Sequence, residues 1–117
     1  MARYILFLHE KPAMFAAMSA TDMARVIGEY KAWSATLRAK NALAGGEKLT
    51  DGPGRLLRRE GSDVIVAEGP YAESRELVGG YFIVVAPDYD TAAALSRDCP
   101  HLRYGGRIEI REIQELG

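Results

Sequence analysis

Apolar residues follow two periodicities along this chain, and each predicts its own class of element. Arg3–His9 is rich in aromatic and β-branched residues, as is typical of a β-strand. Its apolar positions fall on both parities, so both faces of this strand are expected to be covered. Gly80–Ala86 has the same two-sided pattern. Arg107–Ile113 alternates apolar and polar residues and predicts the last strand.

A helical repeat follows the first strand. Ser19–Asp22 resembles a capping box and predicts where the helix begins. Lys40-Asn41 predicts its end, because Asn tolerates the left-handed conformation. One helical stripe holds Met23, Val26, Ile27, Tyr30, Trp33 and Leu37.

A second helix is expected to begin within Pro87–Asp90, with Asp88 or Asp90 as its cap. Pro100 should close it. Its apolar stripe is predicted to hold Ala92, Leu95 and Cys99.

The middle of the chain predicts shorter strands. Leu43–Leu49 is expected to be a strand in which Gly45-Gly46 allows a bend or bulge. Arg55–Glu60 and Asp63–Glu68 should form a hairpin around Gly61-Ser62.

The order of these elements predicts one α+β domain over residues 1–117. It is a ferredoxin-like βαββαβ plan with an inserted β-hairpin and an antiparallel sheet with two helices on one face. Two helices cover one face only, whereas the central strands are apolar on both. A homodimer that packs sheet to sheet would cover the second face.

Composition and charge exclude several classes of protein. The chain has 117 residues, with 15 basic and 16 acidic side chains and a net charge of −1. It has no basic excess for nucleic acid or an anionic membrane. The longest apolar stretch is far too short to span a bilayer. Cys99 is the single cysteine, which excludes an internal disulfide and agrees with a reducing, cytoplasmic location.

Two polar residues are candidates for catalysis. His9 ends the first strand, as either a general base at a cavity mouth or a hydrogen-bonded surface histidine. Glu47 follows Gly45-Gly46, as either a pocket carboxylate with a raised pKa or a solvated group. His101 is expected in a loop. Neither a metal nor another cofactor is predicted, because His9 and His101 form no local ligand motif and the glycine pairs match no nucleotide fingerprint.

Tyr30 and Trp33 lie one turn apart on the helix stripe. They are either core residues or the walls of a pocket between this helix and the sheet, near the end of the first strand. Glu68 and Tyr81 are also expected to line that pocket. Cys99 is interpreted as a small, unreactive buried residue.

Several motifs resemble the YCII-related family, in its DGPF subgroup. The most specific is EGPYAESRE at Glu68–Glu76, followed by a Gly-Gly-Tyr strand at Gly79–Tyr81. GGE at Gly45–Glu47, Asp98-Cys99-Pro100 and Ile108–Arg111 also match. The resemblance covers essentially the whole chain and implies a dimeric α/β barrel.

The motif also has a physical interpretation. Gly69-Pro70 is a rigid turn that ends the hairpin strand, and Gly79 and Gly80 open the next one. Glu73 is expected either to pin the intervening loop by hydrogen bonds or to lie in a loop that overhangs a cavity.

The resemblance implies no established activity. YCII proteins proper carry a His on the first helix and an Asp before the second helix's Pro, where this chain has Tyr30 and Cys99. Related enzymes of the superfamily include dehydrochlorinases and muconolactone isomerases. Three classes stay open: a proton-transfer enzyme for a small cyclic molecule, a ligand-binding or regulatory module linked to an extracytoplasmic-function sigma factor, and a packed barrel without a pocket.

Overall fold

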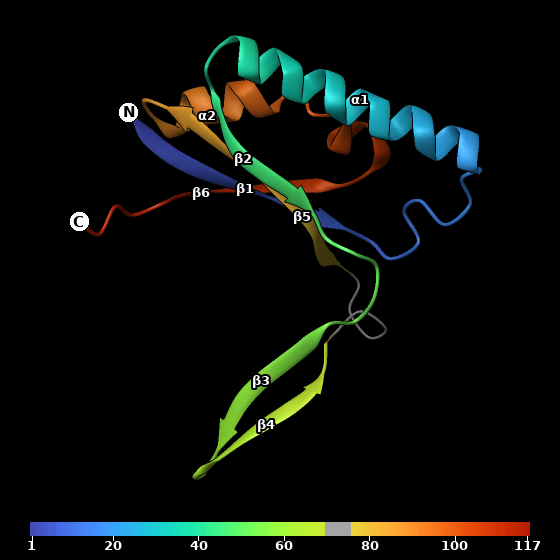
Figure 1. Ribbon diagram of the computed structural model, residues 1–117, viewed down its shortest axis with the longest axis vertical. Helices are drawn as coiled ribbons and strands as arrows, with labels where there is room; N and C mark the ends of the chain where they lie inside the picture. The colour runs from blue at the N-terminus through green and yellow to red at the C-terminus, as the bar shows by residue number, and fades with distance from the viewer. Residues whose placement is uncertain (70–75) are drawn as a thin grey trace.

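A four-stranded antiparallel sheet organises the body of the protein (Figure 1). The computed structural model describes residues 1–69 and 76–117. Its strands lie in the order β2-β5-β1-β6, which is the ferredoxin-like arrangement that the sequence predicts. The bounds are β1 Ala2–Glu10, β2 Leu43–Lys48, β5 Leu77–Ala86 and β6 Arg107–Glu112.

Both long helices lie on one side of this sheet (Figure 1). Helix α1 spans Ala20–Ala39 and helix α2 spans Tyr89–Ser96. The Ser19 hydroxyl accepts a hydrogen bond from the Asp22 amide at 3.1 Å, and Asn41 has φ of 56° just past the C-terminus. Both predicted boundaries of the first helix are therefore confirmed. Neither helix is long and apolar enough to cross a membrane.

The second helix is shorter than predicted. Asp88 caps it, accepting from the Thr91 amide at 2.8 Å, but the helix ends at Ser96. Cys99 therefore lies beyond the α2 stripe and precedes a 3₁₀ helix, η2, at Pro100–Tyr104. Pro100 starts this element, because a proline fits the first helical position, where no amide donor is needed. His101, expected in a loop, lies within η2.

The inner face of the sheet packs against the helices. Tyr4, Leu6 and Leu8 of β1 are buried there together with Val84 and Ala86 of β5. On the opposite face, Ile5 and Phe7 are half-buried and pair with Ile83 and Tyr81. The central strands are apolar on both faces, as predicted, and the helices cover only one of them.

The inserted hairpin stands apart from the body (Figure 1). Strands β3 (Arg55–Glu60) and β4 (Asp63–Glu68) form a two-stranded sheet of their own, with the predicted bounds. Leu57 on β3 is 66 % exposed, and Leu56, Val64 and Val66 are also exposed.

The loop after the hairpin is described only at its ends. The Gly69 amide donates to the Gly54 carbonyl at 3.2 Å, and a Cβ at position 69 would lie 1.7 Å from the Pro53 carbonyl oxygen. Glu76 forms a bidentate ion pair with Arg107 of β6. The expectations for Pro70 and Glu73 lie outside the described residues.

Candidate functional site

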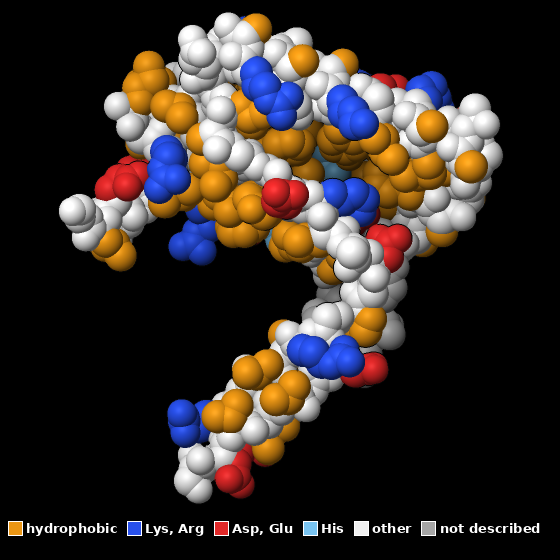
Figure 2. Space-filling view, in the orientation of Figure 1, with side chains coloured by type: hydrophobic (Ala, Val, Ile, Leu, Met, Phe, Trp, Pro, Cys, Tyr) orange, Lys and Arg blue, Asp and Glu red, His pale blue; other side chains and the backbone are white. Residues whose placement is uncertain are grey.

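A cavity of about 690 Å³ opens between α1 and the sheet, beside the end of β1. Figure 2 shows apolar side chains gathered in this hollow beneath the helix. Many of the side chains that line it are apolar, including Leu8, Phe15, Met23, Val26, Ile27, Leu77 and Phe82. A mostly apolar concavity with a few polar groups is the usual form of a small-molecule site.

The most deeply placed polar group of this cavity is His101. Its side chain is 2 % exposed, and Nε2 lies 2.7 Å from the backbone carbonyl oxygen of His9. A carbonyl oxygen only accepts hydrogen bonds, so Nε2 carries the proton of the neutral ring. Nδ1 is then an acceptor, and it lies 2.9 Å from the hydroxyl oxygen of Tyr30. The Tyr30 hydroxyl therefore donates to His101.

Burial shifts the pKa of both side chains so that each favours its neutral form. Desolvation lowers the pKa of the His101 imidazole, although its hydrogen bond to the His9 carbonyl acts in the opposite direction. Desolvation also strongly raises the pKa of the Tyr30 phenol, with smaller contributions from Cys99 and Glu10. The resting pair is a neutral phenol donating to a neutral imidazole.

Glu10 brings a carboxyl group to the same cavity. It is the last residue of β1, and parity places it on the inner face after Leu8. Burial is the largest influence on its carboxyl and raises its pKa, and Asp51 adds to this rise while Lys48 opposes it. Glu10 and Tyr30 both line the cavity, and the Glu10 charge is one of the smaller influences that raise the pKa of the Tyr30 phenol.

Two glycines make room for these side chains. A Cβ at Gly79 would lie 1.3 Å from Oε1 of Glu10, and one at Gly106 would lie 2.2 Å from Nε2 of His101. Gly79 also falls opposite the Leu8/His9 step, where the register of β1 and β5 shifts. Each glycine thus leaves the space that a titratable side chain of the cavity occupies.

The structure places His9 and Glu47 apart. His9 points to the outer face of the sheet, where its Nε2 lies 2.8 Å from Oε1 of Glu109. Glu47 is exposed on edge strand β2, pairs with Tyr81 and borders the cavity rim. Strand β5 separates β2 from β1, so these two side chains do not converge.

The four predicted pocket residues also separate. Tyr30 lines the cavity, whereas Trp33 is a core residue that packs edge-on against Phe82 at 5.0 Å between ring centroids. Tyr81 lies on the outer face opposite Phe7, and Glu68 is exposed at the end of the hairpin. Cys99 is 1 % exposed in the core and does not line the cavity, and burial raises the pKa of its thiol to about 11.

His101 follows a proline in an apparent loop, so its position in the sequence does not mark it as a site residue. The usable signal was the pairing of glycines with polar residues. Gly105-Gly106 follows His101 at short distance, and Gly79-Gly80 faces the end of β1 in the register. Across residues 1–69 and 76–117, no group of three or more His, Cys, Asp or Glu residues is arranged to hold a metal ion.

The YCII-related domain model matches residues 2–116, which is nearly the entire chain. No curated protein matches the sequence.

Proposed function

The chain belongs to the YCII-related domain family, and on that premise we propose that its cavity binds a small, largely apolar molecule and transfers a proton on it. The observation that carries this proposal is the Tyr30–His101 hydrogen bond of 2.9 Å inside an apolar cavity. Tyr30 presents its hydroxyl oxygen there, and His101 stands behind it as the proton acceptor.

The pair works as a relay. An acidic C–H or O–H of the bound molecule gives its proton to the Tyr30 oxygen while the phenol proton moves to Nδ1 of His101. Tyr30 stays neutral throughout, which suits its high pKa. His101 becomes an imidazolium that keeps its Nε2–H on the His9 carbonyl. The substrate carries the matching negative charge.

Glu10 supplies the complementary group. Burial favours its protonated form, and a protonated carboxyl donates a hydrogen bond to an oxygen on which negative charge develops. Return of the proton to a different atom gives an isomerisation, and departure of a leaving group gives an elimination. Both belong to the lyase- or isomerase-like chemistry of small cyclic molecules.

Deuterium exchange tests this chemistry without a known product. Small lactones and cyclic ketones are incubated with the protein in D₂O, and loss of the proton next to the carbonyl is followed by ¹H NMR. The proposal expects catalysed exchange that Tyr30→Phe and His101→Gln each reduce by about 10²-fold or more. His9→Gln is the control and should leave the rate unchanged. Exchange that survives in both cavity variants would contradict the relay.

A second candidate function is binding without turnover, in a regulatory module linked to an extracytoplasmic-function sigma factor. It is favoured by Cys99, which stands where YCII proteins proper carry the Asp of their His/Asp pair. A buried thiol with a pKa near 11 cannot serve as a carboxylate. Ligand binding at His101 with no deuterium exchange for any bound compound would support this alternative.

We also propose that the protein is a homodimer, as in a dimeric α/β barrel. The half-buried Ile5, Phe7 and Ile83 lie on the sheet face opposite α1 and α2. Light scattering at micromolar concentration should give twice the 12.8 kDa chain mass. Phe7→Asp should yield monomer or unfolded protein, and Ala32→Asp on the exposed side of α1 should not. A stable wild-type monomer would overturn the proposal.

Two finer assignments rest on the sequence. We propose the DGPF subgroup from the motif at Glu68–Glu76, and a cytoplasmic location from the single cysteine, Cys99.

A further inference from the structure

We infer that the end of the cavity formed by Ser34 and Arg38 is a carboxylate-binding subsite, so that the ligand is a small organic acid with an apolar body. This inference rests on the proposed function, because it names the class of molecule that the same cavity takes. The groups that would bind the carboxylate are Ser34 and Arg38, not the Tyr30–His101 pair.

The first observation is a row of polar side chains along one face of α1. Tyr30, Ser34 and Arg38 are spaced four residues apart, and all three line the cavity. Residues at this spacing stack along one helix face. Tyr30 and Arg38 start roughly 12 Å apart along the axis, at 1.5 Å per residue. The cavity thus has its relay beside Tyr30 and a polar end at Ser34 and Arg38.

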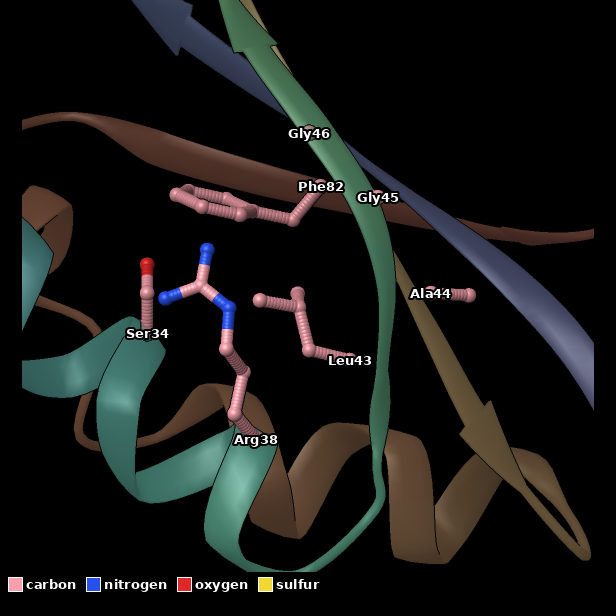
Figure 3. A pocket seen from close by; sticks show the side chains of 7 residues that line it. All are labelled: Ser34, Arg38, Leu43, Ala44, Gly45, Gly46 and Phe82. Atoms are coloured by element: carbon pink, nitrogen blue, oxygen red, sulfur yellow. The ribbon is translucent and has the colours of Figure 1, made fainter.

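The second observation concerns Arg38. Its guanidinium reaches back from the last turn of α1 into a recess of about 250 Å³, between Ser34 and the Phe82 ring (Figure 3). Arg38 is exposed, and within the described part of the chain its side chain makes no hydrogen bond to another residue and has no carboxylate within 4.0 Å. An arginine fork held over an apolar surface with its donors open is suited to a bidentate carboxylate.

Ser34 gives the third observation. It is 7 % exposed, and its hydroxyl points into the recess (Figure 3). Ser96 is the natural comparison, because it is also a buried helix serine. Ser96 donates to the Ala92 carbonyl at 2.8 Å, the usual solution for a helix interior. The Ser34 hydroxyl has no such partner among the described residues, and because its oxygen is not sealed from solvent it is open to a ligand in the recess.

The charged residues that line the cavity also favour a carboxylate at the α1 wall. Lys31, the other basic residue of the α1 wall, borders the same cavity, and Figure 2 shows basic side chains on the helix above the hollow. The acidic lining residues Glu10, Glu47 and Asp51 come from the opposite wall, where Asp51 lies 3.9 Å from Lys48. Gly46 of β2 completes the recess and leaves space beside Phe82 that a side chain would fill. A ligand carboxylate is therefore expected to lie against α1.

The test compares 3-phenylpropionate with its neutral amide, 3-phenylpropionamide. Both are titrated into the full chain, and dissociation constants come from protein-observed NMR. The wild type should bind the carboxylate at least tenfold more tightly than the amide. Arg38→Gln should abolish this preference while amide binding is kept, and Arg38→Lys should retain only part of it. Arg25→Gln removes a charge from the same helix outside the cavity and should retain all of it.

Each outcome decides between the two proposals. Equal binding of acid and amide by the wild type, or a preference that survives Arg38→Gln, overturns the subsite and leaves the cavity proposal standing. Binding of neither compound at millimolar concentration contradicts the proposed function itself. A preference that Arg25→Gln removes as strongly as Arg38→Gln reports general surface charge and also overturns the subsite.

Discussion

At the end of β1, the two histidines of the chain lie on opposite faces of the sheet. The His9 side chain lies on the outer face beside Glu109, whereas its backbone carbonyl accepts the hydrogen bond that holds His101. His101 belongs to the inner face and is almost fully buried. The same strand end thus presents a half-exposed His9–Glu109 contact on one side and a desolvated hydrogen-bonded pair on the other.

This difference follows from strand parity, because successive side chains of a strand point to opposite faces of the sheet. Tyr4, Leu6 and Leu8 face the helices, so His9 must face away and Glu10 must face the cavity. A polar residue that ends an apolar strand is only a site candidate once its parity is known. The imidazole that enters the cavity comes instead from η2, nearly a hundred residues further along the chain.

The largest expected effect on stability comes from truncating a side chain on the inner face, and the matching truncation on the outer face gives the comparison. Leu6 is fully buried on the inner face, so Leu6→Ala should destabilise the protein by about 2–5 kcal/mol, independently of protein concentration. Ile5→Ala, on the adjacent outer position, should cost less per chain but weaken the dimer, so its stability relative to the wild type should change with protein concentration. Urea denaturation at two protein concentrations measures both. Concentration-independent behaviour of the wild type and of Ile5→Ala would break the assignment of the outer face.

A methyl group at Gly106 should disturb the inner face alone. Its carbon would lie 2.2 Å from Nε2 of His101, so the ring must move away from the His9 carbonyl. We expect Gly106→Ala to cost about 1–3 kcal/mol through overpacking and a lost hydrogen bond, as measured by denaturation. Gly45→Ala is the matched control, because no atom lies within 4 Å of the added carbon there. Equal costs would show that the His101 position is not constrained.

The pH dependence of stability should distinguish His101 as well. Desolvation lowers its pKa in the folded state below the ordinary value of 6.5. The unfolded chain therefore takes up this proton first, and stability should fall as pH drops from 6.5 toward the folded pKa. His101→Gln should remove that fall. Glu10 acts with the opposite sign, because its raised pKa favours the folded state as pH falls, so Glu10→Gln should steepen the loss. A slope that His101→Gln leaves unchanged would contradict the desolvated ring.

The smallest effect is expected on the outer face. The His9–Glu109 pair is partly exposed, with side chains 20 % and 49 % accessible. Solvent screens such a pair, so Glu109→Gln should change stability by less than about 1 kcal/mol. A thermal melt checks this. A larger loss would mean that this pair is shielded from solvent and not screened by it.

Much of the fold could be predicted because each element carries its own local signal. Ser19, Asn41 and Asp88 occupy the predicted cap positions, and the hairpin has its predicted bounds. The predicted end of the second helix is wrong, because Pro100 does not close α2 but opens η2. A proline is compatible with both boundaries, so sequence alone did not separate them.

The candidate site was less predictable. The location between the first helix and the sheet, and Tyr30 as a lining residue, were expected from the helix stripe. His101 was not, since its role depends on contacts with Tyr30 and with the His9 backbone, both distant in sequence. Arg38 and Ser34 also stand out only in three dimensions, where their lack of partners among the described residues can be compared with Ser96.

The cavity at Tyr30 and His101 is the ligand site that we propose for this protein. It is tested most directly by recording the imidazole ¹H–¹³C resonances of the two histidines during a titration with neutral 3-phenylpropionamide. His9→Gln assigns the two signals. We expect a saturable shift of the His101 resonances, with those of His9 unmoved. A shift confined to His9, or no shift of His101 at saturating ligand, would contradict it.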